Sequence, residues 1–247
     1  MQDNLKLMTL NIWGGHVESP LLGFIENYKG VDIFCLQEVY KDANAQISTE
    51  DRSLSLNIYS KIQGILKNHN GYFSPVVDGV YGLATFVKKD IEVMQYGQVK
   101  IHDNPNYIGK GPTHSRIMQN YDLKYKNTEF TVLNVHGLWN GNGKTDSPER
   151  IIQSNKIKDF VNKIDKPLIL CGDFNLAPDT NSLKIVEDGM IDLVANNNIL
   201  STRTVLYPGK EKYADYIFCS YEIKILDFSV LPDVVSDHRP LLVKFGL

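Results

Sequence analysis

The chain has 247 residues, of which 43% are hydrophobic and 22% charged, the composition of an ordinary globular protein. Its 26 Lys and Arg against 29 Asp and Glu give a net charge of -3, which argues against general, charge-driven binding along nucleic acid. A local basic groove is still compatible with this charge. Cys35, Cys171 and Cys219 lie far apart in apolar runs, so we expect buried reduced thiols without disulfides or metal spacing.

Transport and anchoring signals are missing from this sequence. No apolar run approaches the length of a membrane span, and the first residues lack the basic and apolar regions of a signal peptide. We therefore expect a cytoplasmic monomer without a transmembrane segment, and a secreted form with a trimmed leader stays open.

The first half of the chain alternates predicted strands and helices. In chain order these are a strand at 5–12, a helix from Pro20 to Gly30, a strand at 31–36 that finishes in Gln37-Glu38, and a helix at 54–67. Ser19 is expected to cap the first helix, with Pro20 in its first turn.

From residue 72 the apolar pattern becomes shorter and more alternating. The predicted strands are 83–87, 91–94, 117–123 and 130–135, with a hairpin turn inside 122–127 and long loops at 102–115 and 137–146. A helix opening at Ser147-Pro148, a strand from 168, a helix at 182–188 and strands at 216–219, 223–230 and 241–245 follow. Several hairpins among helices predict two packed sheets with helices outside, in one domain over 1–247.

One strand leads directly into polar residues. Residues 168–171 predict a strand buried on both faces, and Gly172 predicts a tight turn at its end. Asp173 and Asn175 follow two apart, where α/β sheets place ligands. Taken alone, this block is a turn as often as a site.

Other apolar strands end in the same kinds of residue, which favours the site. The further examples are Asn11, Glu38, His136, Asp215 and Asp237-His238. Because they all fall at strand ends, we expect these side chains to converge on one pocket.

The residue types restrict the chemistry of such a pocket. Carboxylates and carboxamides without cysteine ligands suit Mg²⁺, with Mn²⁺ as the alternative, and disfavour zinc. Two histidines can transfer protons or stabilise negative charge. A metal, imidazoles and amides together suit the attack of water on a phosphate ester. The sequence contains neither the G-x-S-x-G motif of serine hydrolases nor a glycine-rich nucleotide-binding motif, so it does not support either chemistry.

The chain resembles the endonuclease/exonuclease/phosphatase superfamily, which includes deoxyribonuclease I, apurinic endonucleases, sphingomyelinases and inositol-polyphosphate 5-phosphatases. The matching blocks follow the family's order, and they are residues 8–12, 35–39, 134–136, 171–175, 215–218 and 236–240. The resemblance implies a four-layer α/β sandwich, with two central sheets flanked by helices. It also implies a metal-dependent hydrolase of phosphoester bonds.

The resemblance also implies roles for the residues in these blocks. Glu38 is expected to be the principal Mg²⁺ ligand with Asn11 beside it, and Asp237 a ligand at a second metal position. Asp173 would orient or deprotonate the attacking water, and Asn175 would hold a phosphate oxygen. His238, held by Asp215, would contact the scissile phosphate, and His136 would bind phosphate or protonate the leaving group. Which histidine is the acid stays open.

The substrate is less well indicated than the reaction. The family branches that act on DNA, sphingomyelin and inositol phosphates carry a histidine at the position of His136, and apurinic-type nucleases do not. A small cationic rim can come from Lys88, Lys89, Lys110, His114, Arg116, Lys144 and Arg150. Trp13, Tyr107 and Trp139 lie in or beside loops, where they can stack on a base or sugar.

Three functions compete for this sequence. The leading hypothesis is a nuclease-type phosphodiesterase that cleaves nucleic acid with Mg²⁺, with Arg116 and Trp139 binding substrate. The alternative is a phosphatase or phosphodiesterase for a small molecule or a lipid headgroup, such as a sugar phosphate, an inositol phosphate or a sphingomyelin-like headgroup. It is motivated by the scarcity of positive charge. A third reading is a binding module that has lost catalysis, which the complete set of polar residues disfavours.

Overall fold

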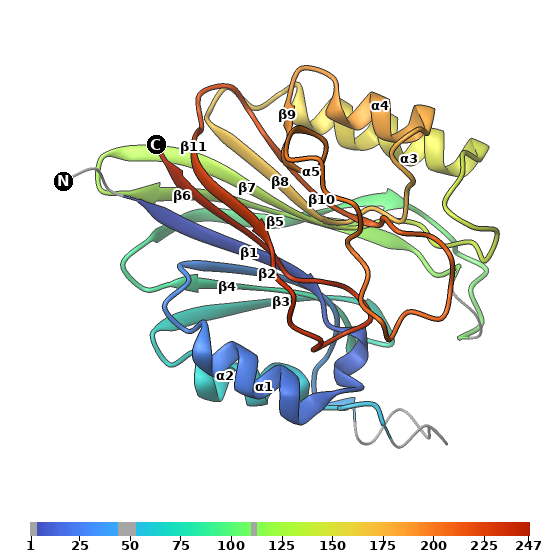
Figure 1. The fold of residues 1–247 in the computed structure, drawn as a ribbon, viewed down its shortest axis with the longest axis horizontal. Helices are drawn as coiled ribbons and strands as arrows, with labels where there is room; N and C mark the ends of the chain where they lie inside the picture. Colours follow the sequence, from blue (N-terminus) through green and yellow to red (C-terminus); the bar gives the residue numbers. More distant parts are fainter. Residues whose placement is uncertain (1–3, 44–52, 110–112) are drawn as a thin grey trace.

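The computed structural model describes residues 4–43, 53–109 and 113–247, and it forms the four-layer α/β sandwich that the sequence predicts (Figure 1). Two six-stranded sheets pack face to face. Helices α1 (Glu18–Asn27) and α2 (Ile58–Ile65) cover the outer face of one sheet. Helices α3 (Pro148–Val161), α4 (Asn181–Glu187) and α5 (Leu193–Asn196) lie on the outer side of the other.

The first sheet joins the two ends of the described chain. Its strand order is β11 (Lys224–Val230), β12 (Leu241–Gly246), β1 (Leu5–Asn11), β2 (Ile33–Tyr40), β4 (Tyr81–Lys88) and β3 (His69–Val77). Only β1 and β2 run parallel, and the other neighbours are antiparallel. The strand β1 is therefore central, with the late strand β12 on one side and β2 on the other.

The second sheet has a similar plan. Its strand order is β5 (Glu92–His102), β6 (Arg116–Tyr125), β7 (Thr128–His136), β8 (Leu168–Asp173), β10 (Asp215–Cys219) and β9 (Ile191–Asp192). The parallel pair is β7 and β8, and every other pair is antiparallel. A two-residue loop joins β6 to β7, which confirms the hairpin expected inside 122–127.

Both faces of the central strands are buried, which explains their near-continuous apolar sequences. In β1, Leu5 and Leu7 point between the sheets and join the larger hydrophobic cluster. The alternating Met8 and Leu10 point the other way, into the cluster that contains α1 and α2. The three cysteines are free and buried, as expected.

Two helices differ clearly from the prediction in where they begin or end. The first helix begins at Glu18 and its cap position is Val17, without a side-chain hydrogen bond, so Ser19 is not the cap. The second helix covers only 58–65 of the predicted 54–67. The third helix is as expected, because Ser147 Oγ accepts a hydrogen bond from the Arg150 amide and Pro148 follows the cap.

Three edge strands were missed or underestimated. The edge strand β3 is mostly half-exposed and contains Gly71 and Pro75, residues that weaken a strand pattern but are tolerated at an edge. The exposed edge strand β5 extends from 92 to 102, well beyond the predicted 91–94. The two-residue β9 leaves too short a pattern to detect. None of the helices in the described part of the chain is long and apolar enough to cross a membrane.

Candidate active site

Strand register brings three of the expected residues into one row. In the second sheet His136, the last residue of β7, pairs with Asp173, the last residue of β8. Asp173 in turn pairs with Asp215, the first residue of β10. All three side chains are buried. The row confirms that these strand-end residues lie together, although they are far apart in sequence.

Gly172 is needed for a reason other than the predicted turn. The residue lies inside β8, with φ at +137°. A Cβ atom there would lie 2.1 Å from the carbonyl oxygen of Val135 on the neighbouring strand. The glycine thus lets β7 and β8 approach closely beside Asp173. The turn comes later, at Asn175, which has φ +55° and whose amide donates to Asp173 Oδ1 over 2.9 Å.

Glu38 reaches the site through an irregularity in β2. The prediction ended the strand at residue 36, but β2 continues to Tyr40, and its register with β4 shifts between Leu36 and Val39. Glu38 lies in this bulge with φ +58°. A bulge redirects the side chains of a strand, which explains how Glu38 faces the site from within a strand.

Asn11 connects the two sheets at the site. Its Nδ2 donates to Glu38 Oε1 and to Asp173 Oδ2, each over 2.9 Å. Its Oδ1 accepts from the backbone amide of Trp13 over 2.9 Å, and because that amide only donates, the orientation of the Asn11 amide is defined. In this arrangement Asn11 fixes two carboxylates by hydrogen bonds, and its expected contact with a metal stays a prediction.

His238 is held between a carboxylate and a guanidinium. Its Nδ1 lies 2.8 and 2.9 Å from the two oxygens of Asp215, as expected. Its Nε2 accepts a hydrogen bond from Nη1 of Arg203. Burial lowers the pKa of His238, but Asp215 and further carboxylates outweigh it and the net direction is upward. Because a guanidinium only donates, Nε2 of His238 carries no proton in this arrangement.

His136 has a different environment. Its Nε2 lies 2.8 Å from Nη1 of Arg116, so this nitrogen is also an acceptor. Burial and the positive charge of Arg116 place the pKa of His136 well below its ordinary value. His136 is therefore a neutral imidazole, whereas His238 is the more basic of the two.

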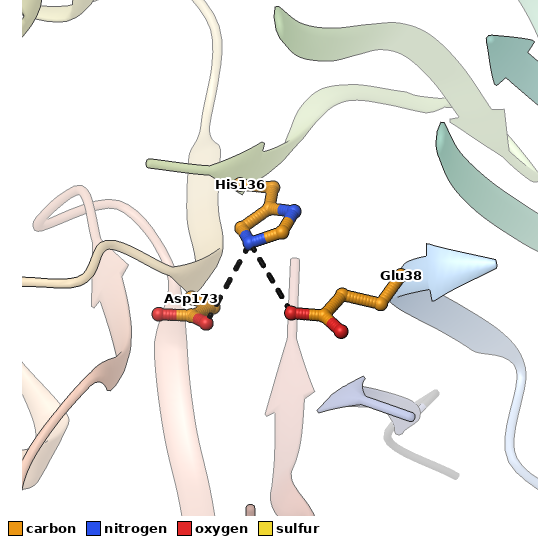
Figure 2. A group of neighbouring side chains, drawn as sticks. All are labelled: Glu38, His136 and Asp173. Carbon is orange, nitrogen blue, oxygen red and sulfur yellow. Dashed lines mark ion pairs between the residues drawn. The ribbon is translucent and has the colours of Figure 1, made fainter. Parts of the chain in front are cut away.

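The carboxylates at this site fit a divalent cation of the hard type. Ligand atoms of Glu38, His136 and Asp173 all lie within 4.8 Å of one another, and Figure 2 shows the three side chains turned towards a common point. His136 Nε2 is 3.6 Å from Glu38 Oε1 and 3.8 Å from Asp173 Oδ2. Burial and the nearby Asp237 and Asp173 raise the pKa of Glu38. Such repulsion between clustered carboxylates is what a bound cation relieves.

Asn175 is positioned by a buried lysine. Lys144 Nζ donates to Asn175 Oδ1 over 2.7 Å and lies 5.4 Å from the ring centre of Trp139. Lys144 is only 2% exposed, and burial lowers its pKa to about 8. Although burial also raises the pKa of Asp173, the nearby His238 and Lys144 hold it well below its usual range.

These residues line one pocket of about 670 Å³. Asn11 and Asp215 do not line this pocket, although both contact residues that do. The lining includes Glu38, Arg116, His136, Trp139, Lys144, Asp173, Asn175, Arg203, Asp237 and His238, with Trp13, Tyr40, Tyr81, Tyr107 and Tyr207 as aromatic walls. Arg116 and Trp139 both line this pocket, and their expected contacts with substrate stay predictions.

Most of the expected cationic rim is absent. Burial and Arg116 lower the pKa of His114 to about 3, so this pocket residue is neutral. Arg150 is buried and donates to the carbonyl groups of Leu138, Thr145 and Gly143, so it holds a loop. Lys88 pairs with Asp32, and neither it nor Lys89 lines the pocket. Lys110 lies outside the described residues.

Arg203 is a charged residue of the pocket that the motifs did not indicate. It comes from the segment before Asp215, where Ser201-Thr202-Arg203-Thr204 has no pattern of its own. Its Nη1 also donates to Asp237 Oδ2 over 2.8 Å. The expected second metal ligand Asp237 is therefore paired with an arginine here.

The comparisons with known proteins agree with this geometry. The sequence model of the Endonuclease/Exonuclease/phosphatase family matches residues 8–238, and the chain belongs to this family. It is thus an enzyme of the metal-dependent class that hydrolyses phosphoester bonds. A search of curated protein sequences gives no match.

Solved structures share the fold at low identity. A family protein from Bacteroides thetaiotaomicron superposes with a TM-score of 0.76 at 19% identity, covering 99% of this chain and 98% of that one. A mannosyl-6-phosphatase from the same organism gives 0.74 at 18% identity, with coverage of 98% and 100%. ANGEL2, a 2′,3′-cyclic phosphatase, gives 0.72 at 16% identity, with coverage of 99% and 95%.

Proposed function

We propose that this enzyme uses Mg²⁺ to hydrolyse the phosphoester of a compact substrate, such as a sugar phosphate or a nucleotide. The observation that supports the proposal is the position of the positively charged side chains. Arg116, Lys144 and Arg203 are all more than nine-tenths buried and all line the one pocket of about 670 Å³. Charge gathered inside a pocket suits a single phosphate group, whereas grip on a long nucleic acid needs many basic contacts along its backbone.

The residues have the following roles in this proposal. Glu38 would hold the Mg²⁺ ion with Asp173 and Asp237 nearby, and the ion would supply positive charge for the phosphate oxygens. Asp173 orients the attacking water, since its pKa keeps it ionised. Asn175, held by Lys144, contacts a phosphate oxygen.

The two histidines have different roles in this proposal. His238, with Nδ1 on Asp215, is the more basic ring. In the acid role its Nε2 takes up a proton and no longer accepts from Arg203, whose Nη1 then donates to Asp237 alone. His136 is kept neutral beside Arg116, and its Nε2 accepts a hydrogen bond from Arg116 Nη1, which positions that guanidinium in the pocket. This assigns the acid to His238 and leaves His136 to accept a hydrogen bond.

The similarity to a mannosyl-6-phosphatase of the same fold supports a sugar-phosphate substrate. The test is release of inorganic phosphate from a panel of sugar phosphates and nucleotides, compared with cleavage of labelled single- and double-stranded oligonucleotides. Each assay is run with Mg²⁺, with Mn²⁺ and with a chelator. We expect metal-dependent release of phosphate from compact esters. Cleavage of oligonucleotides at a higher rate than this release would refute the proposal.

Cleavage of nucleic acid is the second candidate, and the aromatic side chains favour it. Trp13, Tyr107 and Trp139 line the pocket and can stack on bases. Since the pocket is compact, a short single-stranded or terminal segment is the form expected to enter. The oligonucleotide arm of the same panel distinguishes this candidate from the first.

A further inference from the structure

Arg203 is a buried cation beside the segment that contains Asp237 and His238. It is 8% exposed and lines the pocket. Its backbone forms a β-bridge with His238, flanked by hydrogen bonds from the Thr204 amide to Asp237 O over 3.0 Å and from the Arg239 amide to Thr202 O over 2.8 Å. These bonds hold the backbone of Arg203 in place relative to His238.

One end of the guanidinium is already occupied. Nη1 donates to Asp237 Oδ2 and to His238 Nε2. The flat group also stacks on Tyr207, with Cζ 4.0 Å from the ring centre, and the hydroxyl of Tyr207 donates to Glu211 over 2.9 Å. Stacking fixes the plane of the guanidinium without using its donors.

The other edge of the guanidinium has no partner. Nε is buried and makes no hydrogen bond, and within residues 4–43, 53–109 and 113–247 none is made by Nη2, which is not fully buried. Nε and Nη2 carry parallel N–H groups, the fork that matches two oxygens of one phosphate. Because a buried donor without a partner is costly, the unpaired Nε indicates a ligand that the pocket is built to receive.

We infer that Arg203 binds the substrate phosphate through this fork and thereby selects phosphomonoesters over phosphodiesters. The inference rests on the proposed function and deepens it. A monoester has three non-bridging oxygens and a diester has two. One of them is expected to face the metal-binding carboxylates Glu38 and Asp173. A monoester then leaves two oxygens for the fork, whereas a diester leaves one, so that one of the two donors stays unpaired.

A binding experiment tests the inference without turnover. Inorganic phosphate and dimethyl phosphate are titrated by calorimetry into wild type, Arg203→Gln and Arg203→Lys in the presence of Mg²⁺. The surface substitution Lys163→Gln removes one positive charge from an exposed position and serves as the control. We expect Arg203→Gln to weaken phosphate by about 10- to 100-fold and dimethyl phosphate by less than about threefold.

The lysine variant separates geometry from charge. Arg203→Lys keeps the charge but lacks the fork, so it is expected to lose the preference for phosphate over dimethyl phosphate. A retained preference in this variant would overturn the inference, and so would equal weakening of both ligands in Arg203→Gln. If either variant fails to fold, Tyr207→Leu is used instead. Without the stack we expect phosphate affinity to fall about threefold or more, with dimethyl phosphate unchanged.

A matched pair of substrates then connects binding to turnover. Wild type is expected to hydrolyse p-nitrophenyl phosphate with a higher kcat/KM than bis(p-nitrophenyl) phosphate, and Arg203→Gln to remove most of the difference. Should wild type hydrolyse neither compound nor any member of the substrate panel, the proposed function fails while the binding result for Arg203 stands. Hydrolysis of both, with no dependence on Arg203, refutes the inference alone.

Discussion

At the scale of single residues, the two histidines of the site differ because of their partners. Both present Nε2 to an arginine, Arg116 for His136 and Arg203 for His238. Only His238 has a carboxylate, Asp215, at Nδ1 within hydrogen-bond distance. The carboxylate raises the pKa of one ring, while burial and a guanidinium lower that of the other. Two identical side chains thus acquire different proton affinities.

The first prediction concerns Asp215. Asp215→Asn removes the negative charge that favours the proton on His238 Nδ1 and stabilises the charged ring. We expect kcat to fall by about 10²- to 10⁴-fold, with KM changed by less than about threefold. Steady-state kinetics on the best compact ester from the panel measure this, with Lys163→Gln as the control. A kcat near that of wild type would remove His238 from the proposed acid role.

The second prediction concerns Lys144 and alkaline pH. Because burial lowers its pKa to about 8, Lys144 is positively charged below that pH and neutral above it. We expect kcat/KM to decline above pH about 8 as the charge beside Asn175 is lost. Lys144→Arg stays charged, so its decline should occur at higher pH. The same alkaline limb in both proteins would assign the decline to another group.

At the scale of secondary-structure elements, the sequence predicted positions that depend on one strand at a time. Apolar runs placed His136, Asp173 and Asp215 at strand ends, and register then aligned them. The bulge at Glu38 was not predictable, because it arises from the pairing of β2 with β4. The missed Arg203 enters the site through a bridge to a residue 35 positions away. Such placements depend on contacts between segments, which a single sequence does not display.

The third prediction concerns the close approach of β7 and β8. Gly172→Ala would place a methyl group 2.1 Å from Val135 O, at a φ that side chains rarely adopt. We expect it to lower the free energy of unfolding by more than about 3 kcal/mol. The control is Gly141→Ala, since Gly141 also has positive φ but nothing within 4 Å of the added atom, and about 1–2 kcal/mol is expected there.

Urea unfolding of both glycine variants measures the difference. A similar loss at Gly141 and Gly172 would mean that backbone conformation alone requires the glycine, and not the contact between strands. Activity is the second measurement. Because Asp173 follows Gly172 directly, we expect Gly172→Ala to lose turnover under conditions where it is still folded.

At the scale of the whole molecule, the site is shared by the two sheets. Asn11 and Glu38 come from the first sheet, and His136, Asp173 and Asp215 from the second. The hydrogen bond from Asn11 to Asp173 crosses between them. A cation bound by Glu38 and Asp173 would therefore join the two halves of the sandwich.

The fourth prediction follows from that bridge. Mg²⁺ is expected to raise the Tm of wild type by about 5–10 °C at saturation, because it binds only the folded state. Glu38→Gln should remove most of this increase, and the exposed control Glu222→Gln should keep it. Thermal unfolding with and without Mg²⁺ measures the effect, with Mn²⁺ as the alternative ion. An equal increase in Glu38→Gln would place the ion elsewhere.

The pairing of β1 with β12 also has a consequence for protein synthesis. Strand β1 is the first of the described strands to be made, yet one of its two neighbours, β12, is the last of them. Asp237 and His238 lie just before β12, so they emerge from the ribosome equally late. A nascent chain therefore has no complete site. We expect the hydrolytic activity to arise only after translation has passed β12, so that unfinished chains cannot attack phosphoesters near the ribosome.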